Sequence, residues 1–283
     1  MSEVAARPSS IDPSRGAATV LRSLAFNVVF YVAIVGLMVL GLPTLVAGRR
    51  SVIGLARLWG AVSVWLLSRI AGLRIEYRGV DNIPADGFIL ASKHESFLET
   101  FALLKHAPDF AIILKKQLVF LPLFGLYLLA AGQIAIDRSH ARRALAQMIA
   151  KARAVLADGR QLFIYPEGTR RPPGAPPRYK SGVAALYAAT GAPCLPVALN
   201  TGLYWARRGF TRRPGVAVIE YLPPIPPGLA RAAFLARLES DIETACARLN
   251  AEAVAADPRL ARVLAAGKAT VDKPGDADSK RRA

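Results

Sequence analysis

The chain has few cysteines, histidines and acidic residues. Its two cysteines, Cys194 and Cys246, form no CxxC pair. They are too few for a disulfide framework, which favours a reducing, cytosol-facing location. Three histidines leave little for a transition-metal site. The 20 acidic residues are outnumbered by 37 basic ones, and the net charge is +17. Such a surface favours anions: nucleic acid, acidic lipid headgroups, phosphorylated substrates or acidic carrier proteins.

Hydrophobic residues are abundant, at 53% of the 283 residues, which excludes an intrinsically disordered chain. The run 23–48 contains no charged residue and has basic residues on both sides. Its part before Pro43 is long enough to cross the ~30 Å hydrocarbon core of a bilayer as a helix. We therefore predict a membrane anchor; a signal peptide and a buried core helix are the alternatives. The flanking basic residues do not fix its orientation.

A second apolar stretch covers residues 58–68 (LWGAVSVWLLS) and is too short to span a bilayer. Its apolar residues recur at helical spacing, and Trp59 and Trp65 are of the type that membrane interfaces favour. We predict a re-entrant or interfacial helix; an ordinary core helix of the following domain is the alternative.

From residue 74 onward, short apolar runs alternate with helical patterns, which predicts an α/β domain with a mostly parallel central sheet flanked by helices. The expected strands are 74–78, 88–92, 110–114, 133–137, 162–165, 195–199 and 216–222, and the expected helices lie near 97–106, 140–157, 182–190 and 229–254. We accordingly divide the chain into a disordered N-terminus (1–20), a membrane anchor (21–73), a catalytic or binding domain (74–257) and a disordered basic tail (258–283).

The first candidate constellation follows the second expected strand and reads KHESFLE from Lys93 to Glu99. Histidine is a residue type suited to general-base work, and a carboxylate can fix the orientation of the His94 ring. His94 and Glu99 would point in different directions on one straight helix. They can meet only if His94 precedes the helix and Glu99 lies in its first turn. The alternative is structural, because Ser96 and Glu99 also form a capping-box pattern.

The second constellation, YPEGTR, follows the expected strand 162–165. Gly168 allows close approach of the backbone to a ligand, and Arg170 can bind a phosphate through two parallel hydrogen bonds. Glu167 could orient that arginine or accept a hydrogen bond from a ligand hydroxyl, and Thr169 lies between them. The alternative is a tight turn with solvated charges.

Two further elements complete the set. The segment 132–138 ends in Asp137 and Arg138, for which a surface ion pair is the alternative. The run 195–200 contains Pro196, which suggests an edge or a bulge, although a core strand is the interpretation we favour.

In this order and spacing the four elements resemble the glycerolipid acyltransferase family, in particular its bacterial 1-acyl-glycerol-3-phosphate acyltransferases. The family's first block is a histidine and an acid with four residues between them, matched by His94 and Glu99. Its second ends in an arginine, matched by Arg138. Its third is Pro-Glu-Gly-Thr-Arg, matched by 166–170, and its fourth centres on a proline, matched by Pro196.

The resemblance covers roughly residues 74–225, with two departures. Lys93 stands where the family often has Asn, and Glu99 where it often has Asp. The longer glutamate side chain means that its contact with the histidine must be re-aimed slightly. Further on, basic residues interleave with aromatic ones, which suits a membrane interface or an acidic carrier protein; a solvated loop is the alternative. These residues are Tyr204, Trp205, Arg207, Arg208, Phe210, Arg212 and Arg213.

The resemblance implies acyl transfer from acyl-CoA or acyl carrier protein to the sn-2 hydroxyl of lysophosphatidic acid, without a covalent acyl-enzyme. His94 and Glu99 would be catalytic, and the substrate would be bound by Arg138, Glu167, Gly168, Thr169, Arg170 and Pro196. It implies no cofactor or metal, and a catalytic domain on the cytoplasmic side of the bacterial inner membrane.

Other functions remain open on the sequence alone. The acceptor could be a lyso-ornithine lipid or another lysophospholipid. The net charge of +17 also suggests a membrane-tethered nucleic-acid-binding module, although no nucleic-acid motif is recognisable and we expect no nucleic-acid partner. A non-catalytic lipid-binding relative is a further alternative.

Overall fold

One sheet forms the centre of the computed structural model, which describes residues 16–137 and 141–269. Within these residues it has seven strands in the order β1-β7-β6-β2-β5-β3-β4. All neighbouring strands are parallel except β6 and β7, so the predicted, mostly parallel α/β architecture is confirmed. The strands are β1 (Leu73–Arg78), β2 (Ile89–Ser92), β3 (Phe110–Lys115), β4 (Ile134–Ile136), β5 (Gln161–Ile164), β6 (Cys194–Leu199) and β7 (Gly215–Tyr221).

Strands β2, β5 and β6 lie side by side at the middle of the sheet. Leu90 is in register with Phe163 on one side and with Leu195 on the other. Every residue of these three strands is buried, because helices cover both faces. A strand buried on both faces needs apolar residues without alternation, which is why their sequences read as short continuous apolar runs. The carboxyl ends of all three strands therefore open at one edge of the sheet.

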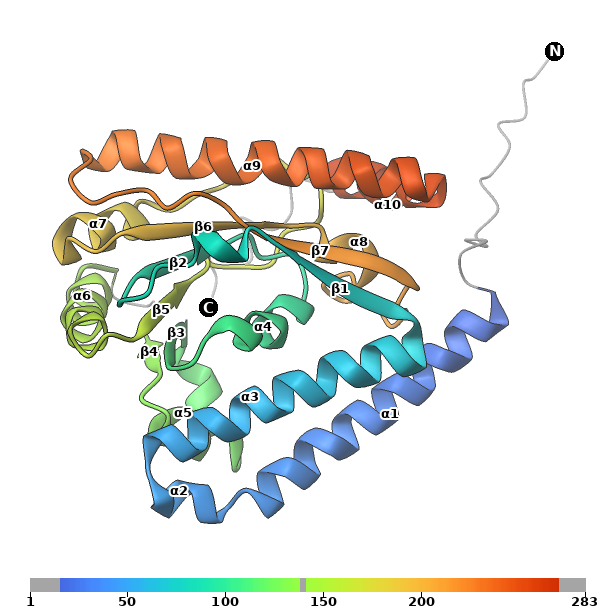
Figure 1. Cartoon of the computed structure of the whole chain (residues 1–283), viewed down its shortest axis with the longest axis horizontal. Coiled ribbons are helices and arrows are strands. Elements are labelled where there is room, and N and C mark those ends of the chain that lie inside the picture. The colour runs from blue at the N-terminus through green and yellow to red at the C-terminus, as the bar shows by residue number, and fades with distance from the viewer. Residues whose placement is uncertain (1–15, 138–140, 270–283) are drawn as a thin grey trace, which may run out of the picture.

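Three helices cover one face of the sheet: α6 (Ala141–Ala157), α7 (Ser181–Thr190) and α9 (Arg231–Ala256) (Figure 1). Their apolar stripes form one core with the sheet, in which the rings of Tyr187 and Phe234 stack at 3.8 Å. The sequence analysis predicted all three helices, near 140–157, 182–190 and 229–254. The long helix α9 crosses β6, which brings its middle close to the carboxyl end of that strand.

The opposite face is covered by α1 (Ala17–Leu40), α3 (Arg49–Leu66) and the short α4 (Leu98–Ala102). Aromatic rings fill the contact between these helices: Phe30 of α1, Trp59 of α3 and Phe101 of α4 lie within 6.3 Å of one another. The same cluster includes Phe97 and Trp205. The N-terminal helices are thus packed directly against the helix that follows the first constellation.

The N-terminal region differs from the prediction of one spanning helix and a short interfacial one. Helix α1 is joined through α2 (Pro43–Ala47) to α3, and α3 continues as a π-helical turn, η1 (Leu67–Ala71). The ranges Ala17–Leu40 and Arg49–Ala71 contain 24 and 23 residues, and both are long and apolar enough to cross a membrane. The eleven-residue estimate was wrong because the helix extends to Arg49 through residues such as Val52 and Ile53, which are buried.

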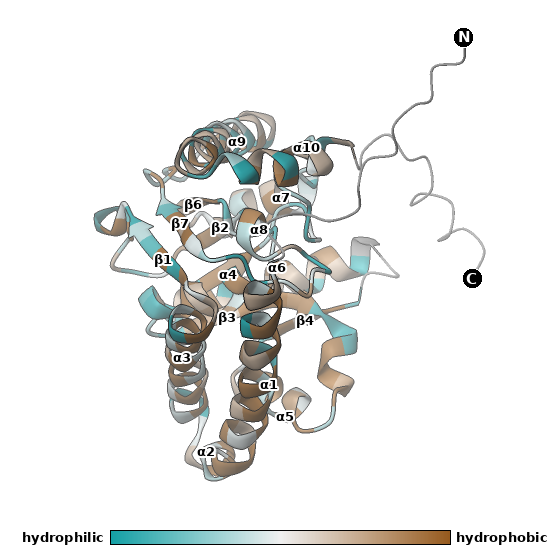
Figure 2. Ribbon diagram, turned by 90° about the vertical axis from the view of Figure 1, so that its right-hand side faces the viewer, coloured by the Kyte–Doolittle hydropathy of each residue, from teal (hydrophilic) through white to brown (hydrophobic). Residues whose placement is uncertain are grey.

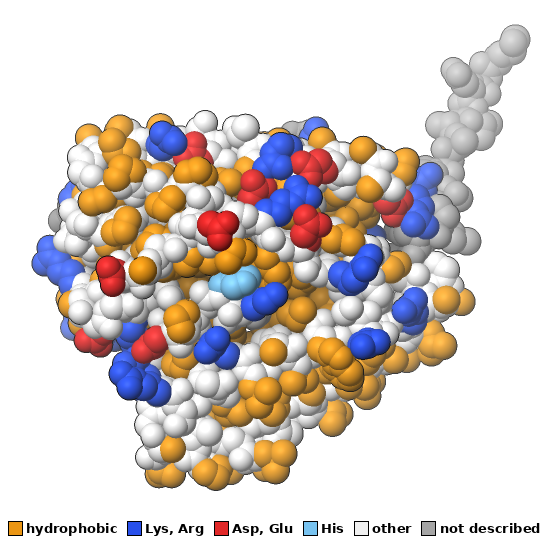
Figure 3. Space-filling model, in the orientation of Figure 1, with side chains coloured by type: hydrophobic (Ala, Val, Ile, Leu, Met, Phe, Trp, Pro, Cys, Tyr) orange, Lys and Arg blue, Asp and Glu red, His pale blue; other side chains and the backbone are white. Residues whose placement is uncertain are grey.

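This helical pair exposes much of its apolar surface and extends away from the sheet (Figure 2). Figure 3 shows hydrophobic side chains gathered along the lower margin of one face, over α1, α2 and α3, with Lys and Arg side chains between them and the sheet. At the end next to α2 the pair is held by Asp109, which forms ion pairs with Arg49, the first residue of α3, and with the buried Arg160. The pair is therefore fixed to the domain that it precedes.

Several short elements complete the described chain: η2 (Val80–Asn82), η3 (Leu103–His106), η4 (Lys116–Phe120), α5 (Phe124–Ala130), α8 (Thr201–Tyr204), η5 (Pro258–Leu260) and α10 (Ala261–Ala269). The sequence analysis did not predict α5 or α8. Two predictions of disorder need correction: residues 17–20 belong to α1, and residues 258–269 are helical, because Leu260 is buried and Leu264 packs on the core. The rest of the predicted disordered ends, 1–15 and 270–283, lies outside the described residues.

Candidate active site

Two of the predicted constellations meet where β2 and β5 end. The two strands are parallel neighbours, so the segments that follow Ser92 and Ile164 leave the sheet at the same edge. The backbone N–H of Arg171 donates a hydrogen bond of 2.8 Å to the carbonyl oxygen of His94. Residues that are separated by some seventy positions in the sequence thereby form one site.

The His94 and Glu99 side chains are in contact. His94 lies in the turn before α4 and Glu99 in its first turn, and Nδ1 of His94 is 2.8 Å from Oε1 of Glu99. The ionised carboxylate can only accept a hydrogen bond, so Nδ1 carries the ring proton and Nε2 keeps a free electron pair. The His94 side chain is 15% exposed, whereas Glu99 is fully buried. The arrangement is that of a base held in one tautomer by a buried acid.

Glu99 also caps the start of α4. Its Oε1 accepts the backbone N–H groups of Glu95 and Ser96, at 2.8 and 2.7 Å, and Ser96 Oγ accepts the N–H of Leu98. The contact from Glu99 to the Ser96 N–H that the capping box predicts is therefore present, although Ser96 Oγ bonds Leu98 instead of Glu99, and the same carboxylate oxygen holds His94. The two interpretations are compatible, because one oxygen can serve the cap and the ring together.

The second oxygen of Glu99 accepts a hydrogen bond of 2.7 Å from Oγ1 of Thr201. Thr201 is fully buried at the carboxyl end of β6, the strand beside β2. The sequence analysis did not single out Thr201. The signal that could have found it is its place directly after an apolar strand, since neighbouring parallel strands end at the same edge.

His94 stacks on Tyr165, with ring centroids 3.9 Å apart and planes 19° apart. Burial raises the pKa of Tyr165, as does the charge of Glu99, while the nearby Arg170 guanidinium opposes this shift. Among the described residues, the buried Tyr165 hydroxyl has no hydrogen-bond partner. Arg170 is partly exposed and follows in the same turn, where Gly168 has a φ of +66°. This left-handed conformation explains the glycine in the motif.

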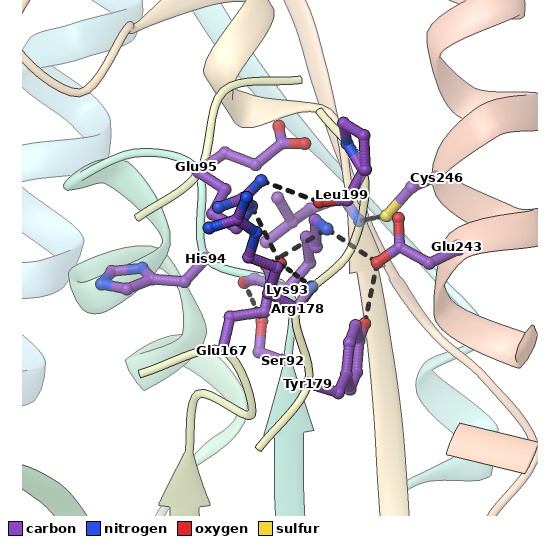
Figure 4. A network of polar contacts seen from close by, with 12 residues as sticks. Ser92, Lys93, His94, Glu95, Glu167, Arg178, Tyr179, Leu199, Glu243 and Cys246 are labelled. Atoms are coloured by element: carbon purple, nitrogen blue, oxygen red, sulfur yellow. Dashed lines mark hydrogen bonds and ion pairs between the residues drawn. The ribbon is translucent and has the colours of Figure 1, made fainter. Parts of the chain in front are cut away.

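Glu167 is buried, in contrast to the alternative of a turn with solvated charges. It is 3% exposed, and its partners are Lys93, Arg171 and the backbone N–H of Arg178, at 3.1, 3.4 and 3.1 Å. We had expected Glu167 to orient Arg170 or to accept from a ligand hydroxyl. The structure instead pairs it with Arg171, because the turn at Gly168 points the carboxylate into the protein (Figure 4).

Lys93 lies at the centre of this buried network. Its Nζ is 2.7 Å from Glu243 of α9 and 3.1 Å from Glu167, and the Tyr179 hydroxyl donates to the same oxygen of Glu243. Burial by itself lowers the pKa of Lys93, but the charges of Glu167 and Glu243 outweigh burial and raise it. Lys93 therefore stays charged. The sequence analysis noted it only as a departure from the family's asparagine.

Glu95 is a second buried acid beside the site. Its Oε2 accepts the N–H of Gly202 at 3.0 Å, and it is 1% exposed. Burial raises the pKa of Glu95 to about 8, against the smaller opposing effect of Lys93, so this carboxyl group is mostly protonated at neutral pH. Glu95 and Glu99 are thus neighbouring buried acids with different hydrogen-bond partners.

The remaining predicted residues lie elsewhere or outside the described chain. Arg138 lies in the segment 138–140, outside the described residues, and the preceding Asp137 pairs with Lys116 at 3.5 Å. Pro196 is buried in β6 in register with Ala91, which agrees with the core-strand interpretation; its predicted role in binding stays a prediction. In the described part of the chain, no three His, Cys, Asp or Glu side chains come together as a metal site requires.

The site thus consists of a histidine–carboxylate pair and an arginine-bearing turn at one edge of a mostly parallel sheet. Residues 74–200 match the family model described as Acyltransferase, which confirms the resemblance seen in the motifs. A solved structure described as the 1-acyl-sn-glycerophosphate (LPA) acyltransferase from Thermotoga maritima has the same fold, with a TM-score of 0.68 and 21% identity. It covers 82% of this chain and 98% of its own.

Two curated relatives are similar to this chain in sequence. A 1-acyl-sn-glycerol-3-phosphate acyltransferase of Pseudomonas aeruginosa is 39% identical over 165 residues, which are 58% of this chain and 64% of that protein. The protein of the same name from Limnanthes alba is 31% identical over 175 residues, 61% of this chain and 62% of the relative. The match thus spans somewhat less than two thirds of either relative.

Proposed function

We propose that the protein transfers an acyl group from a thioester, acyl-CoA or acyl carrier protein, to the sn-2 hydroxyl of lysophosphatidic acid and forms phosphatidic acid. The observation that carries the proposal is the 2.8 Å contact between His94 and Glu99 beside the turn that contains Arg170. The names of the relatives support the choice of acceptor.

His94 acts as the general base. Its Nε2 removes the proton of the acceptor hydroxyl while the oxygen attacks the thioester carbonyl, and Glu99 stabilises the imidazolium that forms. Collapse of the tetrahedral intermediate breaks the C–S bond, and the proton on His94 passes to the departing thiolate. Both cysteines are buried, and burial raises the pKa of each thiol. These thiols are poor nucleophiles, which supports direct transfer without an acyl-enzyme.

The phosphate of the acceptor binds to Arg170, with Arg138 as a second contact. Arg170 is partly exposed close to the Tyr165 ring on which His94 stacks, and no described side chain accepts a hydrogen bond from its guanidinium. A planar guanidinium suits bidentate binding of a phosphomonoester. The sn-2 hydroxyl lies close to the phosphate in this acceptor, so a phosphate held at Arg170 places the hydroxyl near His94.

The direct test is consumption of acyl-CoA by the purified protein, with and without lysophosphatidic acid. We expect thioester loss and phosphatidic acid formation only when both substrates are present. A panel of lyso-ornithine lipid and other lysophospholipids separates the acceptors; faster transfer to one of these would replace the proposed acceptor. Arg170→Ala should raise the acceptor KM by about 10-fold or more and leave the acyl-CoA KM unchanged. An unchanged acceptor KM would refute the phosphate contact.

We further propose that α1 and α3 attach the protein to the bacterial inner membrane, with the catalytic domain on the cytoplasmic side. Residues of α1 such as Leu24, Val28 and Val32 are largely exposed. Anionic lipids would add to this attachment, at about 1 kcal/mol for each Lys or Arg near the surface. Cleavage of the domain by protease in inverted membrane vesicles, but not in intact spheroplasts, would support this orientation, and the reverse pattern would exclude it.

The attachment can be tested by flotation with phosphatidylglycerol-containing vesicles. The wild type should float, and the double variant Val28→Asp, Val32→Asp should lose its vesicle binding by about 10-fold or more, because charged residues are costly in the hydrocarbon layer. Lys151→Asp, at an exposed position of α6 on the other face of the sheet, is the control and should float like the wild type. Undiminished flotation of the double variant would show that α1 does not contact lipid.

A further inference from the structure

Three separate segments converge on the buried ammonium group of Lys93. They are the end of β2, the turn 166–171 and the middle of α9, which contribute Lys93, Glu167 and Glu243. The Lys93 side chain is 3% exposed, that of Glu167 is 2% exposed and that of Glu243 is 26% exposed. Helix α9 begins at residue 231, beyond the stretch that matches the family model. The network therefore joins the acyltransferase motifs to an element outside that stretch.

The charges in this network depend on one another. Lys93 and Arg171 provide two positive charges, and Glu167 and Glu243 provide two negative ones. A buried ion pair is costly to break from one side, because the remaining charge is left without compensation. Among the described residues, loss of the Lys93 charge would leave Glu167 with Arg171 as its cationic partner and Glu243 with none. A shift of the Glu167 carboxylate would be passed to the turn 166–171 that carries it.

Displacement of that turn would move Arg170. Glu167 and Arg170 are three residues apart in this turn, and the hydrogen bond from the Gly168 N–H to the Tyr165 carbonyl closes the part of it that contains Glu167. His94 is held independently: its partner Glu99 is fixed by two backbone N–H groups and by Thr201. Figure 4 shows the His94 ring pointing away from the Lys93 network. The side chains of His94 and Glu167 thus have different polar partners, and the two segments are joined through the backbone hydrogen bond from Arg171 to His94.

We propose that Lys93 is a positioning residue: through Glu167 it sets the place of Arg170, and Glu243 is the counter-ion that holds Lys93 there. The function it serves is recognition of the acceptor phosphomonoester, so the inference rests on the proposed function. It gives the lysine that replaces the family's asparagine a specific task, and it makes α9 part of acceptor binding.

The test is a set of purified full-length variants whose KM values are measured separately for lysophosphatidic acid and acyl-CoA. Lys93→Met should raise the acceptor KM about 10-fold or more, while the acyl-CoA KM and kcat stay within about 2-fold of wild type. Glu243→Gln, at a partly exposed position, should raise the acceptor KM about 3-fold. It keeps the proposal testable where Lys93→Met does not fold.

The double variant and one control complete the design. Lys93→Met with Glu243→Gln should have an acceptor KM no higher than that of Lys93→Met alone, because the two residues act through one contact. Asp241→Asn removes a carboxylate of similar exposure, 25%, from the same helix, where it pairs with Arg237, and should have no effect. Additive effects of the two substitutions would contradict the shared contact.

Two other results would overturn the inference. If the acyl-CoA and acceptor KM values rise together, or only kcat falls, Lys93 supports the fold or His94 rather than Arg170. If neither Lys93→Met nor Glu243→Gln changes the acceptor KM although Arg170→Ala does, the positioning role is wrong while the proposed function stands. If wild type does not acylate lysophosphatidic acid at all, the proposed function itself fails.

Discussion

Substitution of His94 by alanine is expected to lower kcat for acyl transfer by about 10²- to 10⁴-fold, the usual contribution of a positioned general base. The imidazole is the only side chain in the described site with a free electron pair on a nitrogen held by a buried acid. Without it, the acceptor hydroxyl must lose its proton to water. Steady-state release of CoA, followed with lysophosphatidic acid at saturation, measures this loss.

The fold should survive this change. The backbone carbonyl of His94 still accepts the Arg171 N–H, and Glu99 still caps α4. His106→Ala is the matched control, because His106 contacts Tyr221 and Tyr77 at the other side of α4 and lies outside the site. Its activity should stay within about 2-fold of wild type. A fully active His94→Ala enzyme would remove the proposed mechanism.

The fold could be predicted largely because the central strands are buried on both faces. That environment requires uninterrupted apolar runs, and each predicted strand lies within one residue of an observed one at both ends. Helices α6 and α9 were recognisable from their apolar stripes. The short helix α8 was not, because its four residues contain no periodic pattern. Helix α3 was predicted too short, because the charged residues near Arg49 interrupt the apolar pattern of its first turns.

The site was predictable only where its partners are close in sequence. His94 and Glu99 are five residues apart, and their contact follows from local helix geometry. Thr201 and Glu243 contact the same segment from 102 and 150 residues away. Such contacts depend on strand order and on the path of α9, and neither of these is set by local sequence. This is why Lys93 had no assigned partner before the structure placed α9 beside it.

Glu99→Gln is expected to lower kcat by about 10²-fold or more with little change in stability, which separates the two tasks of this side chain. The amide oxygen can still accept the N–H groups of Glu95 and Ser96, so the start of α4 is retained. The amide nitrogen then faces Thr201, whose hydroxyl can turn from donor to acceptor. Only the negative charge beside the imidazolium is lost.

Glu99→Ala distinguishes the helix-cap role of Glu99 from its catalytic role. Alanine removes the cap, the ring contact and the Thr201 contact together, and the buried donors left without a partner cost about 1–3 kcal/mol each in unfolding free energy. Thermal unfolding and kcat should therefore fall together in Glu99→Ala, whereas only kcat falls in Glu99→Gln. If Glu99→Gln keeps more than half of the wild-type kcat, Glu99 acts as a helix cap alone, and His94 works without charge stabilisation from it.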